Sequence, residues 1–246
     1  MKIWAHRGCS QRYPENTITS FEKAIAIPNL AGIELDIQMT KDGEIVVLHD
    51  ERVDRTTDGI GYVKDFLYAQ LRELNIEAGE GNKEKIPSIQ EVLDLIQVKM
   101  KEGMFLNIEL KNSMISYAGM EEKILKLIAE RGLQAQIVYS SFSLESMQIL
   151  RKLEPNASIG MLDMTISECL HKKRCISETE DVRIALHPYK GGMNIPKDKL
   201  EGQVVRAWFA GHLYPEKPTG TKLDLDSIEK QGITDVFLNE PEFYLV

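Results

Sequence analysis

Strand-like and helix-like segments alternate along the whole chain, and this alternation limits the possible fold more than any other feature of the sequence. Short β-rich runs recur, and most of them are separated by stretches in which apolar residues follow helical spacing. The β-rich runs are Lys2–His6, Gly32–Met39, Met104–Lys111, Gln136–Ser140, Ser158–Leu162, Val182–His187, Val204–Phe209 and Asp235–Leu238. Eight strands with intervening helices in 246 residues predict an α/β fold, the closed (β/α)8 TIM barrel.

An open, doubly wound sheet is the alternative arrangement of the same elements. Such a sheet usually carries a glycine-rich phosphate loop after its first strand. The residues at the end of the first predicted strand, His6-Arg7-Gly8-Cys9, do not form that pattern. We therefore favour the closed barrel.

Helical spacing is found in most of the intervals between the predicted strands. Pro14–Ile27 opens with a proline, which is a typical residue for the first position of a helix. Thr165–Cys175 has less regular spacing, and only a short helix fits between Pro196 and Glu201. The remaining predicted helices are Ile89–Met100, Glu121–Ile128, Leu144–Leu153 and Leu225–Lys230.

One segment, from about Gly43 to Gly81, departs from the alternation. It contains an extra apolar run at Glu44–His49, a turn-rich stretch, and a short helical pattern at Phe66–Leu74. We expect a single domain spanning residues 1–246, with an insertion at about residues 43–81 between the second and third barrel strands. This insertion is expected to lie over the mouth of the barrel.

Two of the predicted strands place acidic side chains on the face that should point into the barrel. Side chains alternate between the two faces of a strand, so Glu34 and Asp36 project together, opposite the apolar residues of the same strand. In the third barrel strand Asn107, Glu109 and Lys111 share one face in the same way. Because the apolar set packs against the helices, the polar set faces the interior. Burying these charges is costly unless something compensates them.

Three carboxylates in one interior predict a bound cation. Glu34, Asp36 and Glu109 supply only oxygen ligands, which select a hard divalent ion such as Ca²⁺ or Mg²⁺ over zinc or copper. The alternative is a pair of edge strands that each have one solvated face. Two separate strands carry the pattern, and it lies shortly before His49, so we favour the metal site.

Two histidines occupy positions suited to catalysis. His6 ends the first predicted strand, and His49 ends the extra apolar run. Barrels of this class carry their chemistry at the carboxyl ends of their strands. Imidazole titrates near neutral pH, so a pair of histidines can act as general acid and general base. Arg7 and Lys111 add positive charge beside the expected metal ion, which suits a phosphate oxyanion, so the site is typical of metal-assisted phosphoryl-ester chemistry.

The other histidines and the cysteines are expected to have structural or surface positions. His187 follows the sixth strand and is expected to pack, although it could line the mouth. His171 and His212 are expected on the surface. Cys9 lies close to His6, and we interpret it as a wall residue of the site. No pair among Cys9, Cys169 and Cys175 has zinc-ligand or redox spacing, which favours a reducing compartment.

Charge and hydropathy exclude several classes of partner. A net charge of −8 argues against a nucleic-acid binder, because phosphate backbones are held chiefly by Lys and Arg. The chain contains no apolar run near the roughly 20 residues that a membrane-spanning helix needs. Its first residues contain no long apolar core for a secretory signal. We expect a cytoplasmic protein without stable membrane anchoring, whose partner is a small-molecule phosphodiester.

The motifs in the first 111 residues resemble those of the glycerophosphodiester phosphodiesterases. They keep the order and the spacing of that family, and the second half of the chain adds Ser140-Ser141-Phe142. The matching motifs are Ala5-His6-Arg7-Gly8, Pro14-Glu15-Asn16-Thr17, Phe21, Glu34-Leu35-Asp36, Thr40-Lys41-Asp42-Gly43, His49-Asp50, Arg55-Thr56-Thr57-Asp58-Gly59-Ile60-Gly61, Ile86-Pro87-Ser88 and Asn107-Ile108-Glu109-Leu110-Lys111.

The resemblance implies both a fold and a set of roles. The family fold is a (β/α)8 barrel with a small insertion after the His-Asp pair. By this resemblance His6 and His49 are the acid–base pair, and Arg7 and Lys111 contact the phosphate. One Ca²⁺ or Mg²⁺ ion is held by Glu34, Asp36 and Glu109. The implied substrates are deacylated phospholipids, and the implied products are glycerol 3-phosphate and an alcohol.

The second half departs from the family at two strand ends. Many relatives have a Trp-Thr-Val-Asn run where this chain has Trp208-Phe209-Ala210-Gly211, and a Thr-Asp-x-Pro ending where it has Leu238-Asn239-Glu240-Pro241. Trp208 is expected either to pack against the glycerol of the substrate or to belong to the core. These departures concern the substrate more than the reaction. Two alternatives stay open: a phospholipase D-type barrel acting on lysophospholipid or sphingolipid headgroups, and a non-catalytic barrel that binds phosphorylated polyols.

Overall fold

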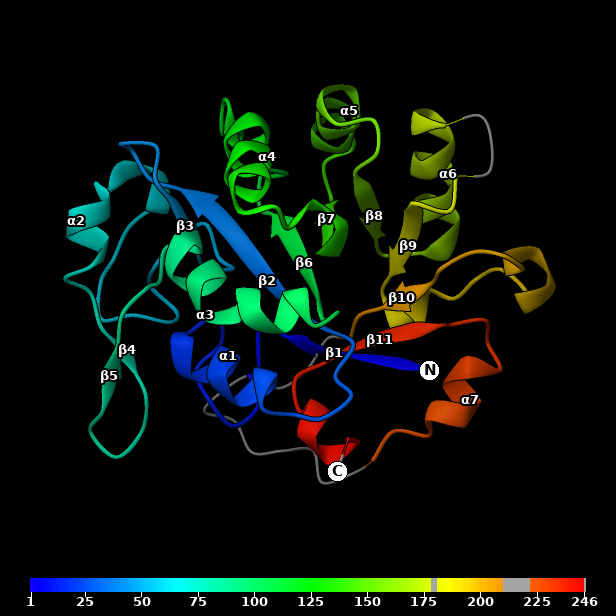
Figure 1. Cartoon of the computed structure of the whole chain (residues 1–246), viewed down its shortest axis with the longest axis horizontal. Coiled ribbons are helices and arrows are strands. Elements are labelled where there is room, and N and C mark those ends of the chain that lie inside the picture. Colours follow the sequence, from blue (N-terminus) through cyan, green and yellow to red (C-terminus); the bar gives the residue numbers. More distant parts are fainter. Residues whose placement is uncertain (178–180, 210–221, 246) are drawn as a thin grey trace.

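The computed structural model describes residues 1–177, 181–209 and 222–245 and has the predicted (β/α)8 architecture (Figure 1). Eight parallel strands form a ring with helices outside it, in the order β10-β11-β1-β2-β6-β7-β8-β9. Isolated parallel bridges, Leu186 to Val205 and Tyr189 to Trp208, join β9 to β10 and close the barrel. The strands are β1 (Lys2–His6), β2 (Gly32–Met39), β6 (Phe105–Leu110), β7 (Ile137–Ser141), β8 (Ser158–Asp163), β9 (Ile184–Pro188), β10 (Arg206–Ala207) and β11 (Asp235–Leu238).

Helices pack around the ring on the apolar sides of the strands. Ile33, Leu35 and Ile37 of β2 are fully buried in the main core, which lies between the strands and the helices. Among the described residues, no helix is both long enough and apolar enough to span a membrane. The helices around the ring are α1 (Ile18–Ile25), α3 (Ile89–Lys101), α4 (Met120–Arg131), α5 (Leu144–Leu153), α6 (Ile166–Ile176) and α7 (Leu225–Glu229).

Single-turn 3₁₀ helices complete the connections. Between β9 and β10 the chain forms η3 (Lys190–Gly192) and η4 (Lys197–Leu200), the latter where the sequence predicts a short helix. The other such turns are η1 (Val63–Asp65), η2 (Gln134–Gln136) and η5 (Pro241–Phe243).

The start of the first helix was predicted wrongly. The helix begins at Ile18 and not near Pro14, because Thr17 is its N-cap: its hydroxyl accepts a hydrogen bond from the amide of Ser20. The preceding residues form a turn in which Asn16 has a φ of 58°. The predicted strand at Val182–His187 is also too long, because Val182 is 78% exposed and β9 begins at Ile184.

The insertion between β2 and β6 has its own small core. β3 (Ile45–Val47) pairs antiparallel with the end of β2, α2 (Tyr68–Leu71) replaces the longer helix predicted there, and β4 (Ile76–Glu77) with β5 (Lys83–Glu84) forms a hairpin. In Figure 1 α2 and the hairpin of β4 and β5 project beyond α1 and α3 on one side of the barrel. The separate core consists of Val46, Leu48, Val53, Val63, Leu71, Ile76 and Ile86.

A buried ion pair lies inside the barrel, away from the predicted site. Arg206 of β10 donates hydrogen bonds to Asp235 of β11, with its Nε 3.0 Å and its Nη2 2.9 Å from Oδ2. The indole of Trp4 donates to the same oxygen at 3.2 Å, and the guanidinium lies 4.1 Å from the centre of its ring. Both charged side chains are more than nine-tenths buried. Loss of either side chain would therefore leave the other with a buried charge and no partner.

Replacing Asp235 with alanine is expected to destabilise the barrel by about 3–5 kcal/mol, because Arg206 would keep a buried charge without its partner. Chemical denaturation should show the loss as a lower midpoint. The exposed Asp198 of η4 is the matched control, and Asp198→Ala should change the free energy of unfolding by less than about 0.5 kcal/mol. Equal midpoints for Asp235→Ala and the native protein would contradict this assignment.

Candidate active site

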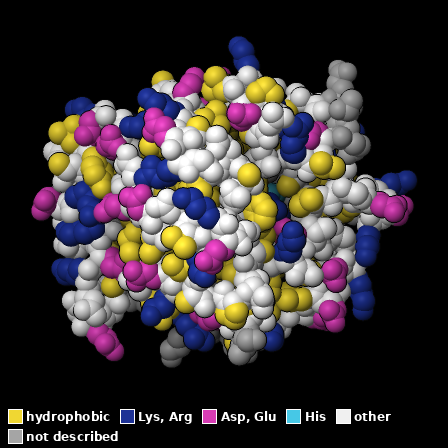
Figure 2. Space-filling model, in the orientation of Figure 1, with side chains coloured by type: hydrophobic (Ala, Val, Ile, Leu, Met, Phe, Trp, Pro, Cys, Tyr) yellow, Lys and Arg dark blue, Asp and Glu magenta, His cyan; other side chains and the backbone are white. Residues whose placement is uncertain are grey.

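A cavity of about 370 Å³ lies among residues at the carboxyl ends of the barrel strands. The insertion contributes one side of it through His49, Asp50 and Arg55. The outer surface has acidic and basic side chains interspersed over the face shown in Figure 2, whereas the cavity gathers its charges against an apolar wall. The rest of its lining is His6, Arg7, Glu34, Asn107, Glu109, Lys111, Ser140, Phe142, Leu162, Trp208, Phe209, Phe237 and Asn239.

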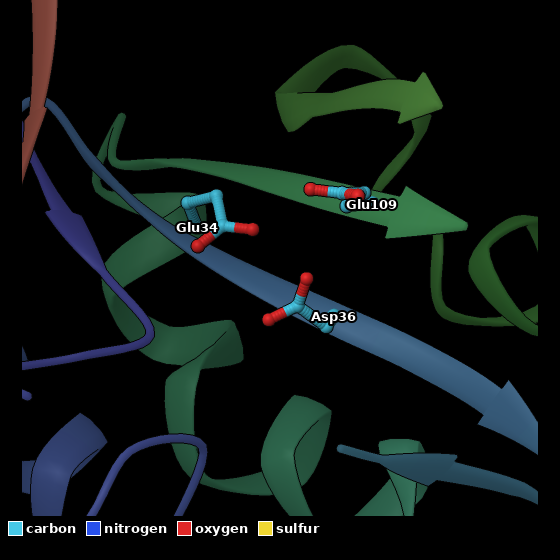
Figure 3. A group of neighbouring side chains, drawn as sticks. All are labelled: Glu34, Asp36 and Glu109. Atoms are coloured by element: carbon cyan, nitrogen blue, oxygen red, sulfur yellow. The ribbon is translucent and has the colours of Figure 1, made fainter. Parts of the chain in front are cut away.

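Three carboxylates from two neighbouring strands meet inside the barrel. Asp36 of β2 is paired in register with Glu109 of β6, so both side chains leave the sheet on the same face, and Glu34 lies two residues earlier on that face. Figure 3 shows the three carboxylates facing one another. One oxygen from each lies within 4.8 Å of the others, and all three side chains are buried.

The donor set fits a hard divalent cation. Glu34 Oε1 and Asp36 Oδ1 are buried, and neither accepts a hydrogen bond from any residue that the structure describes. Burial, Asp36 and Glu109 raise the pKa of Glu34 well above its ordinary value. Burial also raises the pKa of Asp36, but His49, Arg7 and Lys111 outweigh that effect and hold it low. The cluster thus has unpaired oxygens and repelling charges that a cation would satisfy.

His6 lies at the end of β1, and a hydrogen bond holds one of its two ring nitrogens. Its Nδ1 donates a hydrogen bond to Oδ1 of Asn239 at 2.6 Å. This bond leaves Nε2 as the nitrogen with a lone pair, 3.8 Å from Glu34. Burial and the neighbouring Arg7 lower the pKa of His6 to about 3, so the imidazole is neutral near pH 7 and can accept a proton.

His49 is held in the same manner from the insertion. Its Nδ1 donates a hydrogen bond to Oδ1 of Asp50 at 2.6 Å, and its Nε2 accepts one from Nζ of Lys111 at 3.1 Å. The ring is about 29% exposed and lines the cavity. The two predicted histidines therefore come from different parts of the fold and both offer Nε2 to one site.

Arg7 reaches the cavity through a strained turn after β1. Arg7 has a φ of 58° and Gly8 a φ of 78°, and a Cβ atom on Gly8 would lie 2.5 Å from the Ser20 hydroxyl. Glycine at this position lets the chain turn closely against α1. The Arg7 guanidinium then lies 3.2 Å from Asp36 and donates to Glu15 at 2.9 Å.

Lys111 provides the second cation of the site. It follows β6, and its ammonium group donates to Glu109 at 2.8 Å and lies 3.9 Å from Asp36. Burial lowers the pKa of Lys111, but Glu109 and Asp36 outweigh that effect, so the net pKa is raised and the side chain stays charged.

Trp208 belongs to the apolar wall of the cavity and is also packed. Its indole nitrogen donates to the backbone carbonyl of His187 at 3.2 Å, and its ring lies edge-on to Phe142 at 6.1 Å. The two expectations for Trp208, core residue and substrate contact, are therefore not exclusive. The wall is completed by Leu162, Phe209 and Phe237.

The remaining histidines and Cys9 lie outside the cavity lining or the described residues. His187 is fully buried and accepts a hydrogen bond from Arg206 at 2.9 Å. His171 is exposed on α6, and His212 lies outside the described residues. The expectation that Cys9 is a wall residue was wrong: the turn at Gly8 directs it into the main core beside α1, where burial raises the pKa of its thiol.

Sequence reasoning assigned no role to four polar residues that hold the site together. Asn239 fixes His6, and Asp50 fixes His49. Arg55 and Glu15 form charge-assisted hydrogen bonds with each other and with neighbours of the histidines. Glu15, Asp50 and Arg55 belong to motifs that resemble those of the glycerophosphodiester phosphodiesterases, and this resemblance could have indicated that they have a role. Nothing local in the sequence marks Asn239.

The sequence profile of the glycerophosphoryl diester phosphodiesterase family matches residues 6–181, well over half of the chain. The chain belongs to this family. A glycerophosphodiester phosphodiesterase of Caldanaerobacter subterraneus subsp. tengcongensis is 36% identical over 98% of this chain and 94% of its own length. One from Bacillus altitudinis is also 36% identical, over 98% of this chain and 95% of its own length.

Solved structures of phosphodiesterases share the barrel of this family member. The enzyme from Agrobacterium tumefaciens matches with a TM-score of 0.73 and 24% identity over the full length of both chains. A phosphodiesterase from Oleispira antarctica, solved in complex with the product sn-glycerol-3-phosphate, matches with a TM-score of 0.74 and 24% identity. That match covers 99% of this chain and 94% of the other. At this level of identity the two structures establish the common fold.

Proposed function

We propose that the protein hydrolyses glycerophosphodiesters to glycerol 3-phosphate and an alcohol, in a reaction that depends on Ca²⁺ or Mg²⁺ and uses His6 and His49 for proton transfer. One observation carries this proposal: both predicted histidines, Arg7 and Lys111 line a single cavity together with Glu34 and Glu109, and the fully buried Asp36 completes the carboxylate cluster beside it. Family membership supports it, because relatives that align along nearly the whole chain are named for this activity.

Glu34, Asp36 and Glu109 would hold the divalent ion. When bound, such an ion neutralises charge on phosphoryl oxygens. The unpaired oxygens of Glu34 and Asp36, and the burial of all three carboxylates, support this role. The guanidinium of Arg7 forms an ion pair with Asp36, and the ammonium of Lys111 donates a hydrogen bond to Glu109, so both cations are placed to bind the non-bridging oxygens of the phosphate as charge develops on them.

The two histidines divide the proton transfers between them. One ring starts as the free base, and its Nε2 accepts the proton of the attacking oxygen; the other starts as the imidazolium, and its Nε2 gives a proton to the oxygen of the leaving alcohol. Asn239 and Asp50 hold the rings so that both Nε2 atoms serve the cavity. The attacking oxygen is either a water molecule or the adjacent hydroxyl of the glycerol, and the second route passes through a cyclic phosphate.

In this proposal Trp208 would pack against the glycerol, and the rest of the apolar wall would contact the alcohol. Phe142, Leu162 and Phe237 offer no charge, so the alcohol would be selected by shape and by contact with apolar side chains. A small diester fits a cavity of about 370 Å³, which is near the lower end of common ligand pockets.

Release of glycerol 3-phosphate from a substrate panel tests the proposal. The panel contains glycerophosphocholine, glycerophosphoethanolamine, glycerophosphoglycerol and lysophosphatidylcholine, each with Ca²⁺, with Mg²⁺ and with a chelator. We expect release from at least one of the three glycerophosphodiesters, abolished by the chelator, and ³¹P NMR would detect a cyclic phosphate if one forms. Turnover of lysophosphatidylcholine alone, detected as release of choline with formation of lysophosphatidic acid, would favour the phospholipase D-type alternative. Metal binding without turnover of any of the four would favour a non-catalytic barrel.

A further inference from the structure

Arg55 forms four short hydrogen bonds to two carboxylates that belong to different parts of the fold. Its Nε and Nη2 donate to the two oxygens of Asp50 at 2.6 and 2.9 Å. Its Nη1 and Nη2 donate to the two oxygens of Glu15 at 2.7 Å each. Bidentate guanidinium–carboxylate pairs fix orientation as well as adding energy, so Arg55 holds both carboxylates in one defined geometry.

The two carboxylates lead to the two sides of the active site. Asp50 accepts the hydrogen bond from Nδ1 of His49, on the insertion. Glu15 lies in the turn between β1 and α1 and accepts a hydrogen bond from Arg7, on the barrel. Arg55 therefore connects the insertion, which contains His49, to Arg7, which lies beside the carboxylate cluster.

The local charges explain why an arginine is needed there. Glu15 is only 5% exposed, and burial raises its pKa, but Arg55 and Arg7 outweigh that effect. Burial also raises the pKa of Asp50, but its hydrogen bonds with His49 and Arg55 outweigh that effect, so the pKa is lowered overall. Without the guanidinium, the two carboxylates would repel each other and Asp50 would be free to rotate away from the imidazole.

A neighbouring arginine shows what an ordinary surface pair looks like. Arg52 belongs to the same insertion, its side chain is as exposed as that of Arg55, and it pairs with the exposed Asp54, whereas Arg55 pairs with the buried Glu15. Arg52 is not part of the cavity lining, whereas Arg55 is. The chain thus supplies its own matched control.

We propose that Arg55 is a positioning residue, which holds Asp50 so that His49 keeps its Nδ1–H tautomer with Nε2 toward the substrate, and which ties the insertion to the barrel through Glu15. This inference rests on the proposed catalytic role of His49. It adds a residue whose hydrogen bonds go to Asp50 and Glu15 and not to the carboxylate cluster.

Steady-state kinetics of Arg55→Gln, Arg55→Lys, Asp50→Asn and Arg52→Gln test the proposal. Loss of a group that orients a catalytic histidine typically costs about 10- to 100-fold in activity. We expect Arg55→Gln to lose that much, mainly in kcat, and Arg55→Lys to recover part of it, because a single ammonium keeps the charge without the paired geometry. Arg52→Gln should match the native protein.

A double-mutant cycle separates positioning from a general structural effect. If Arg55 acts through Asp50, adding Arg55→Gln to Asp50→Asn should lower kcat by less than about threefold further, far from the product of the two single effects. Multiplicative losses, a loss confined to KM, or equal kinetics for Arg55→Gln and Arg52→Gln would each overturn the proposal.

The state of the imidazole provides a readout independent of turnover. ¹⁵N NMR of histidine-labelled protein, with the signal assigned through His49→Gln, should show one tautomer of His49 in the native protein and a mixture in Arg55→Gln. An unchanged tautomer in every Arg55 variant would overturn the proposal even if kcat falls or the variant unfolds more easily. Absence of turnover in the native protein would instead contradict the proposed function, while the NMR result still tests Arg55.

Discussion

Replacing either His6 or His49 with alanine is expected to lower kcat by about 10²–10⁴-fold or more, because each would remove one of two proton transfers. Both rings have Nδ1 committed to a fixed partner, so the loss should fall on the chemical step and not on substrate binding. Kinetics under saturating metal should therefore show a lower kcat with a KM close to that of the native protein.

Two comparisons make this result specific. His171→Ala removes an exposed histidine on α6 and should leave turnover unchanged. Calorimetric titration should give the same metal affinity for His6→Ala and His49→Ala as for the native protein. Turnover within a factor of three of the native value in either variant would remove that histidine from the reaction.

Glu34→Gln or Asp36→Asn is expected to abolish metal-dependent activity, and excess Ca²⁺ or Mg²⁺ should not restore it. Each substitution replaces a carboxylate of the proposed metal site with a neutral amide. Removal of metal from the native protein with a chelator should have the same consequence, and return of the metal should reverse it.

Thermal unfolding gives an independent test of the same site. A ligand that binds the folded state at 100 times its Kd stabilises it by about 2.7 kcal/mol. The native protein should therefore unfold at a higher Tm with the divalent ion, and both variants should lose this increase. The exposed Glu130 of α4 is the control, and Glu130→Gln should keep the full increase. Variants of Glu34 and Asp36 that bind the ion normally would show that the ligands are assigned wrongly.

The metal-free protein should respond to Glu34→Gln with a small gain in stability near pH 7. Because the folded-state pKa of Glu34 is raised, this group favours folding at low pH, and that contribution is lost as the pH rises past the raised pKa. Glutamine carries no charge, so it avoids the free-energy cost of a buried carboxylate. A gain in the free energy of unfolding of metal-free Glu34→Gln would show that the site costs stability when it is empty, as functional sites often do.

The barrel and much of its site could be predicted because their signals are local. Alternation in β2 and β6 fixes which side chains point inward, and strand pairing brings Asp36 and Glu109 together from distant parts of the sequence. Each of the eight predicted barrel strands overlaps an observed one. Two predictions were wrong for local reasons. Thr17 caps α1, so the helix starts later than the proline at position 14 suggests, and the turn at Gly8 directs Cys9 into the core.

What could not be predicted depends on contacts between loops. Asn239 meets His6 across 233 positions of sequence, and Arg55 meets Glu15 across 40. No periodicity links such residues, because their approach is decided only when β1 and β11 pair and the insertion docks. The hairpin of β4 and β5 is similar: its strands are two residues each and partly polar, too short for a pattern.

The cavity lining divides along the chain in a way that bears on how such enzymes diverge. The charged groups come from residues 6–111, and the apolar wall comes from residues 142–237. Substitutions in the later half can therefore change which alcohol is accepted while the reactive groups stay intact. Asn239 is an exception, because it holds His6 from the far end of the sequence. A lineage that acquires a new substrate is expected to accumulate changes around Phe142, Leu162 and Phe237 while Asn239 remains constrained.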